Sequence, residues 1–145
     1  MRGRSGHHGG MQIRPALPAD RVAVIAAWEA AGLTRPWNDP GDDFDRALAG
    51  PTSTVLVGVD DATVIATAMA GEDGHRGWVY YLAVREDARG RGLGRAMMAA
   101  AEDWLRARGA VKVQLMVRES NAGVIGFYEA LGYEDAAVRV LGRRL

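Results

Sequence analysis

The chain has 145 residues, 48% of them apolar, and its 18 basic and 18 acidic residues give a formal net charge of zero. This composition is typical of a globular domain, and the neutral balance argues against nucleic acid or a membrane surface as a partner. There is no cysteine, which excludes disulfides, thiolate metal sites and a cysteine nucleophile, and no apolar run that approaches a membrane span. We expect a cytoplasmic protein without a metal site.

Residues 1–10 read MRGRSGHHGG, a polar and glycine-rich stretch without the apolar segment of a signal peptide. We expect a leader, a tag or a disordered tail there, and this tail accounts for the adjacent His7 and His8 without a metal. Residues 11–145 contain no linker and no repeat, so we expect them to form one domain.

The first half of this domain alternates between short strands and helices. We predict a strand at 12–14 and a helix at 18–32. An irregular loop framed by prolines follows at 35–40, and a second helix at 42–48. The first helix has an apolar stripe at Val22, Ile25 and Trp28. β-Branched and aromatic runs separated by polar turns then predict strands at 54–59, 63–70 and 78–84.

The second half continues with a long helix, a strand and another helix. The long helix, which ends near Gly109, has an apolar stripe at Leu93, Met97, Ala100 and Trp104. A period of two predicts a strand over 111–117, Asn121 is suited to cap the next helix, and one or two strands are expected within 133–140. The predicted class is mixed α/β, with one dominant sheet flanked by helices.

A loop rich in glycine and arginine, RGRGLGR from Arg89 to Arg95, joins the strand at 78–84 to the long helix. Glycines let successive amides point into one cavity, and a helix start adds its positive end. Three arginines crowd this helix start, so a phosphate or pyrophosphate is the simplest partner, although Glu86 and Asp87 would neutralise part of the charge. The dinucleotide fingerprint and the P-loop both fail on spacing, which leaves a connecting turn with solvated arginines as the alternative.

The loop resembles the R/Q-x-x-G-x-G/A pyrophosphate loop of the GNAT acetyltransferases, and it likewise follows a strand and opens a helix. RESNAGVIGFYEALGY, from Arg118 to Tyr133, is similar to the strand–Asn–helix–Tyr segment of that family and to the ribosomal-protein alanine N-acetyltransferases. RPWNDP (35–40) and DGHRG (73–77) resemble the YpeA-like branch. The resemblance covers residues 12–145 and implies the single-domain GNAT fold.

The resemblance also implies a site for acetyl-CoA, which would enter where the sheet splays between 78–84 and 111–117. Tyr128 would protonate the leaving thiolate, the Leu82 N–H would stabilise the oxyanion, and Asn121 would bond the pantetheine region or shape the acceptor site. The remaining cofactor-binding positions are the backbone of Leu82, Ala83 and Val84 beside the pantetheine arm, and the amides of Arg89, Gly90, Arg91, Gly92, Leu93, Gly94 and Arg95 around the pyrophosphate.

The acceptor amine is less well defined. In the alanine-acetylating relatives a glutamate on the second long strand is the base, and Met116 occupies the aligned position here. Trp37 either lines the acceptor pocket or lies as a lid over the first helix. The candidates to replace the glutamate are Glu72, Asp73, His75 and Tyr80.

The activity implied is acetyl transfer to a primary amine, which is a protein or peptide α-amine, a lysine or a small-molecule amine. Because the glutamate is replaced, a non-catalytic acyl-CoA sensor is the alternative, and transfer of a longer acyl group is a further one. Members of the family often form homodimers, so a second copy of the chain is another candidate partner.

Overall fold

A computed structural model describes residues 7, 8 and 10–145, so most of the tail expected at 1–10 lies outside the described residues. The chain divides into two compact units, residues 1–115 and residues 116–145, and each is described by itself. No helix among the described residues is long and apolar enough to cross a membrane.

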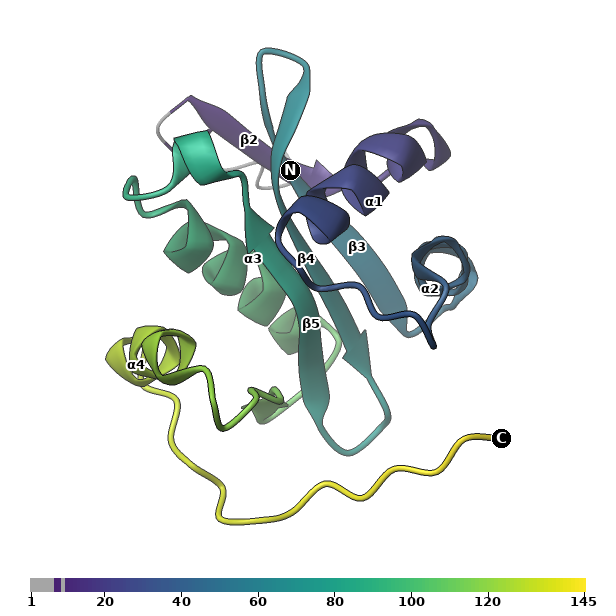
Figure 1. Ribbon diagram of the computed structural model, residues 1–145, viewed down its shortest axis with the longest axis vertical. Coiled ribbons are helices and arrows are strands. Elements are labelled where there is room, and N and C mark those ends of the chain that lie inside the picture. Colours follow the sequence, from purple (N-terminus) through teal and green to yellow (C-terminus); the bar gives the residue numbers. More distant parts are fainter. Residues whose placement is uncertain (1–6, 9) are drawn as a thin grey trace. The chain divides into compact units, whose positions relative to one another are not determined.

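The first unit is built on a mixed sheet of six strands, which lie side by side in chain order (Figure 1). Neighbouring strands run antiparallel except the last pair, in which β6 runs parallel to β5. The strands are β1 (His7–His8), β2 (Met11–Pro15), β3 (Ser53–Asp60), β4 (Thr63–Glu72), β5 (Gly77–Val84) and β6 (Val113–Gln114). With its flanking helices, this sheet confirms the predicted α/β class, in which helices flank one dominant sheet.

Three helices cover the sheet of the first unit: α1 (Arg21–Ala30), α2 (Pro40–Ala49) and α3 (Leu93–Ala107). α1 and α2 lie on one face of the sheet and α3 on the other (Figure 1). Asp39 caps α2, because its carboxylate accepts the amides of Gly41 at 2.8 Å and Asp42 at 3.3 Å, and Pro40 supplies a suitable first residue. The core under α1 and α2 comprises Ala16, Val24, Trp28, Phe44, Ala47, Val55 and Val57.

The predicted apolar stripes are only partly correct. On α1, Val22 is 79% exposed, whereas Val24 and Trp28 are fully buried. On α3 the predicted apolar stripe ended at Trp104, whereas Leu105 is the residue that is buried there. Trp104 is half-buried, and the guanidinium of Arg108 lies over its ring. In alanine-rich helices such as these, two different faces are apolar. Which face is buried depends on how the helix packs against the sheet.

Two predicted strands are wrong or too long. The strand expected over 111–117 is reduced to β6, and Val111 at its start is 86% exposed. Within residues 116–145, all of which the structure describes, α4 (Ala122–Ala130) is the one regular element, and the strands expected within 133–140 do not form. A strand needs a neighbour for its backbone hydrogen bonds, and the local residue pattern does not reveal whether one is present.

Candidate active site

The loop between β5 and α3 has the backbone that its glycines predict. Gly90 and Gly92 have φ angles of +78° and +75°, and open space surrounds the position of a Cβ at both. They are therefore required by conformation rather than by close packing. Gly92 is the N-cap of α3 and has no side chain with which to cap it. The helix's own hydrogen bonding begins with Ala96 N–H, which donates to Gly92 O at 3.1 Å. The first amides of α3 are thus turned toward the loop.

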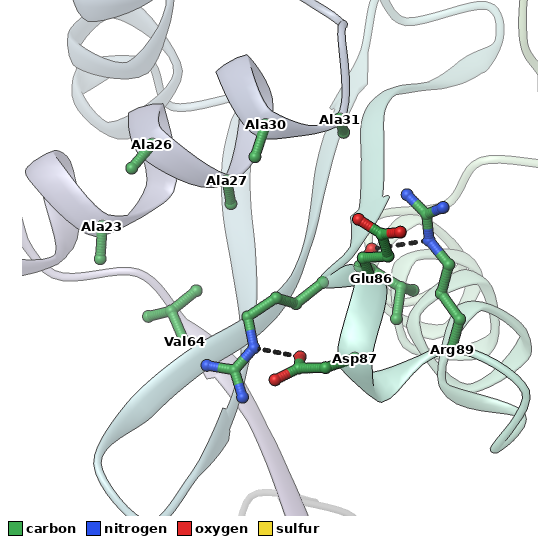
Figure 2. A pocket seen from close by; sticks show the side chains of 11 residues that line it. Ala23, Ala26, Ala27, Ala30, Ala31, Val64, Glu86, Asp87 and Arg89 are labelled. Carbon is green, nitrogen blue, oxygen red and sulfur yellow. Dashed lines mark hydrogen bonds and ion pairs between the residues drawn. The ribbon is translucent and has the colours of Figure 1, made fainter.

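The side chains of Arg89, Arg91 and Arg95 are exposed around this helix start. Arg89 Nε donates to Val84 O at 3.2 Å, which ties the loop back to the end of β5. Asp87, expected to neutralise part of the loop, instead pairs with Arg85 (Figure 2). The positive end of the helix and these arginines together suit an anionic ligand.

A cavity of about 790 Å³ lies beside the loop, between α1 and the end of β5. Its apolar wall includes a row of small side chains on α1, and its rim carries charged side chains (Figure 2). Val84 and Arg89 are the sequence-predicted residues that line it. The remaining lining is Ala23, Ala26, Ala27, Ala30, Ala31, Val64, Arg85, Glu86 and Asp87. These alanines were not among the predicted site residues, although their helical spacing is visible in the sequence.

The outer edge of β5 carries a strand partner for only part of its length. Among the residues that the structure describes, β6 pairs with Gly77 and Trp78 alone. Farther along, Arg85 N–H donates to Ile65 O of β4 at 2.8 Å. Because backbone groups alternate between the two edges of an antiparallel strand, those of Leu82 and Val84 face away from β4, whereas those of Ala83 face toward it. Of the three predicted pantetheine partners, Leu82 and Val84 therefore present backbone groups at the outer edge, where Val84 O already accepts from Arg89 Nε.

A β-bulge interrupts β5 immediately before this edge. Tyr80 lies opposite Met69 and Ala83 lies opposite Thr67, so Tyr81 and Leu82 together oppose one residue of β4. Tyr81 has a φ angle of +54°, a conformation that costs a bulky residue on the order of 1–3 kcal/mol. The sequence gives no signal of the bulge, because the run from Trp78 to Val84 has an ordinary strand composition.

A second cavity, of about 430 Å³, lies at the opposite end of β5. Trp78 and Tyr80 supply an aromatic wall, with their rings nearly parallel at a centroid distance of 6.4 Å. The full lining is Thr52, Ser53, Gly71, Glu72, Asp73, Trp78 and Tyr80. Three of the four candidates to replace the glutamate, Glu72, Asp73 and Tyr80, are thus brought together. His75 is exposed in the following turn and Trp37 is 56% exposed in its loop, and neither belongs to this lining.

The second cavity carries a fixed negative charge. Backbone amides of Arg76 and His75 donate to Asp73 Oδ1 at 2.7 and 2.9 Å and hold the pKa of this carboxyl below its ordinary value. Burial, together with the charge of Asp73, raises the pKa of Tyr80. At neutral pH the cavity therefore combines an ionised carboxylate with an uncharged phenol. Glu72 Oε2 accepts the amide of Gly74 at 3.1 Å.

The second unit contains the other two predicted site residues. Asn121 caps α4 as expected, since its Oδ1 accepts Val124 N–H at 3.4 Å. Tyr128 makes edge-on ring contacts with Phe127 and Tyr133, at centroid distances of 5.1 and 5.8 Å. Burial raises the pKa of Tyr128, so this phenol keeps its proton at neutral pH.

Comparison with known proteins supports one family. The model of the acetyltransferase (GNAT) family matches residues 22–133. An acetyltransferase of Pectobacterium atrosepticum is 46% identical over 135 residues, which is 93% of this chain and 96% of the relative.

Solved structures show the same fold. AAC(6′)-Iy, in complex with the bisubstrate analogue CoA-S-monomethyl-acetylneamine, is similar with a TM-score of 0.81 over 93% of this chain and 98% of that one, and at 17% identity it supports the fold alone. The ribosomal-protein alanine N-acetyltransferase of Escherichia coli is similar with a TM-score of 0.76 and 27% identity, over 88% of this chain and 79% of that one.

Proposed function

This chain belongs to the GNAT family of acetyltransferases, and from that premise we propose that it transfers an acetyl group from acetyl-CoA directly to a primary amine. The observation that carries the proposal is the loop at the start of α3, where two glycines at positive φ, free helix amides and three arginines adjoin the open edge of β5. The chain has no cysteine and therefore no thiol to form a thioester acyl-enzyme, which supports direct transfer.

The cofactor is assigned to the loop and the open edge together. The amides from Arg89 to Arg95 bind the pyrophosphate, with Arg89 and Arg91 supplying positive charge. The pantetheine arm adds to β5 as a strand would, through the backbone groups of Leu82 and Val84. Ala83 is excluded from this pairing, since its backbone groups face β4.

Three groups are assigned to the chemical step. The Leu82 N–H stabilises the oxyanion that forms when the amine attacks the thioester carbonyl. Tyr128, whose raised pKa keeps it protonated, donates a proton to the leaving thiolate. Asn121 has its side-chain oxygen engaged as a helix cap, so its contribution to the pantetheine region is through the start of α4.

The acceptor amine is assigned to the cavity at the start of β5. An amine arrives as a cation, and Asp73 supplies a charge that attracts it, while its lowered pKa makes it a weak base. Glu72 on the same lining is then the better candidate to remove a proton, through water. Trp78 and Tyr80 offer ring faces to a cationic or apolar substituent. The sequences RPWNDP (35–40) and DGHRG (73–77) resemble the YpeA-like branch of the family, and on this resemblance alone we assign the chain to that branch.

Calorimetric titration with acetyl-CoA, followed by thiol release with peptide α-amines, lysine peptides and small polyamines, tests the proposal. Thiol release with one class establishes the enzyme and names its acceptor. Binding without release throughout the panel favours an acyl-CoA sensor, an alternative motivated by Met116 at the glutamate position. Absence of binding contradicts the loop assignment and the proposal with it.

The pyrophosphate site can be tested by removing two of its arginines. Arg89→Ala combined with Arg91→Ala is expected to weaken acetyl-CoA binding at least about tenfold, because two phosphate-directed charges are lost. Arg106→Ala with Arg108→Ala removes the same charge from the other end of α3 and is the matched control. Equal affinity in the two double variants contradicts the pyrophosphate site.

Glu72→Gln is expected to lower the turnover at least about tenfold while acetyl-CoA affinity stays unchanged, because only the proton acceptor is removed. The matched control is Glu29→Gln, at an exposed position on α1. Full activity of Glu72→Gln shows that another group is the base.

A further inference from the structure

The carbonyl of Tyr81, at the β5 bulge, is held by a buried pair of side chains from two other elements. The Thr67 hydroxyl of β4 donates to Tyr81 O at 2.9 Å, and Trp28 Nε1 of α1 donates to Thr67 Oγ1 at 3.1 Å. Both side chains are fully buried. Because the indole N–H only donates, it occupies an acceptor site of the hydroxyl and leaves the hydroxyl proton for the carbonyl. The relay therefore runs in one direction, from Trp28 to Tyr81.

The side chain of Tyr81 is fixed by the same helix and by α2. Its ring stacks on Trp28 at a centroid distance of 3.9 Å and an interplanar angle of 13°, and its hydroxyl donates to Asp43 Oδ2 at 2.7 Å. Trp28 thus holds Tyr81 twice, through the ring directly and through the carbonyl by way of Thr67. These contacts keep the residue at its positive φ.

Thr67 is more than a packing residue. Among the residues that the structure describes, it is the one buried side chain of polar type, and its neighbours on β4 include Ile65, Ala66 and Ala68. A valine would fill the same space on this strand without the cost of burying a hydroxyl. The hydroxyl is therefore explained by the carbonyl that it holds.

The direction of the Leu82 N–H follows from this carbonyl. Tyr81 C=O and Leu82 N–H belong to one planar trans peptide and point in opposite directions. We propose that Thr67 and Trp28 are positioning residues, which fix the Tyr81–Leu82 peptide and so aim the Leu82 N–H away from Thr67. The inference rests on the proposed function, in which this N–H stabilises the oxyanion.

The kinetic test compares Thr67→Val with Thr67→Ser and with Thr63→Val, the same substitution at an exposed position of β4. We expect Thr67→Val to lower kcat for thiol release at least about tenfold and to leave KM for acetyl-CoA within about threefold, because the donor is misdirected while cofactor binding is retained. Thr67→Ser keeps the hydroxyl and is expected to restore kcat to within about threefold of the parent. An unchanged kcat in Thr67→Val, with an active parent protein, overturns the inference and leaves the proposed function intact.

A second measurement does not depend on activity. In ¹⁵N-labelled protein, we expect the amide resonance of Leu82 to shift more in Thr67→Val than that of Ala83 or Val84, and to return in Thr67→Ser. An unshifted Leu82 resonance overturns the inference even where the parent protein transfers no acetyl group. If Thr67→Val does not fold, Trp28→Phe removes the indole donor while keeping a stacked ring, and the same shift and a lowered kcat are expected of it.

Discussion

Among the described residues of the first unit, two places hold residues other than glycine at positive φ, and the two are stabilised in different ways. Asp61 and Ala62, at +48° and +64°, form the exposed two-residue turn between β3 and β4. Positive φ at both positions is what a tight hairpin with the natural strand twist requires, so the conformation is explained locally. Tyr81, at +54°, lies inside a strand and is held by Trp28, Thr67 and Asp43. Its conformation is explained only by tertiary contacts, and it lies beside the backbone that we assign to catalysis.

The largest effect is expected from removing the main support of the bulge. Trp28→Ala deletes a fully buried ring, its stack on Tyr81 and the donor to Thr67, and is expected to lower the free energy of unfolding by about 3–5 kcal/mol. Denaturant unfolding measures this change. Val22→Ala, at a 79% exposed position of the same helix, is the control and should stay within about 0.5 kcal/mol. Equal losses contradict the assigned core face of α1.

A smaller effect is expected from the phenol alone. Tyr81→Phe keeps the stack on Trp28 and removes the 2.7 Å hydrogen bond to Asp43, which retains its ion pair with Arg46. We expect a loss of about 1–2 kcal/mol in denaturant unfolding. Tyr80→Phe, at a 39% exposed neighbour, makes the same chemical change and should cost less. If the two cost the same, the Asp43 contact does not support the bulge.

The phenol of Tyr81 also contributes to the loss of folding stability at alkaline pH. Burial and the hydrogen bond to Asp43 raise the pKa of Tyr81 far above its ordinary value. Above pH of about 10 the unfolded chain loses a proton that the folded protein keeps, so stability falls as the pH rises. Tyr80 and Tyr128 have raised pKa values as well, and part of this fall remains without Tyr81. Unfolding midpoints between pH 9 and 11 should therefore fall less steeply in Tyr81→Phe than in the parent, and parallel curves would contradict this account.

The smallest effect has the opposite sign. Ala62→Gly, in the exposed turn, relieves the left-handed conformation of a residue that carries a Cβ, and it creates the Asp-Gly pair that such turns favour. We expect a gain of about 0.5–1 kcal/mol in stability, without a change in acetyl-CoA affinity. Gly74→Ala makes the reverse exchange at a φ angle of +82° in the neighbouring β4–β5 turn and should be destabilising. A loss in Ala62→Gly would show that the turn is held by more than its local geometry.

Much of the fold was predictable from the sequence because its signals are local. The order of elements from β2 to α4, the proline-framed loop before α2 and the Asn121 cap follow from spacing, propensity and capping, and the structure confirms them. Strand β1 was not predicted, because it lies in the stretch expected to be a leader, a tag or a tail. The loop from Arg89 to Arg95 was also predictable, since glycines at positive φ and a helix start are encoded within seven residues. The strands expected within 133–140 were wrong, because strand formation depends on a partner that the local pattern does not show.

The sequence by itself thus determined the family resemblance, the glycine loop and several residues of the cavity that we assign to the acceptor. Only the tertiary structure decided which faces of α1 and α3 are buried, that Glu72 and Tyr80 share a cavity whereas His75 does not, and that β5 carries a bulge at Tyr81. Each of these depends on residues distant in the chain, and Trp28, Thr67 and Tyr81 meet across separations that no local pattern records. The free energy that holds Tyr81 at positive φ comes from those distant contacts, so the aim of the Leu82 N–H is a property of the folded chain.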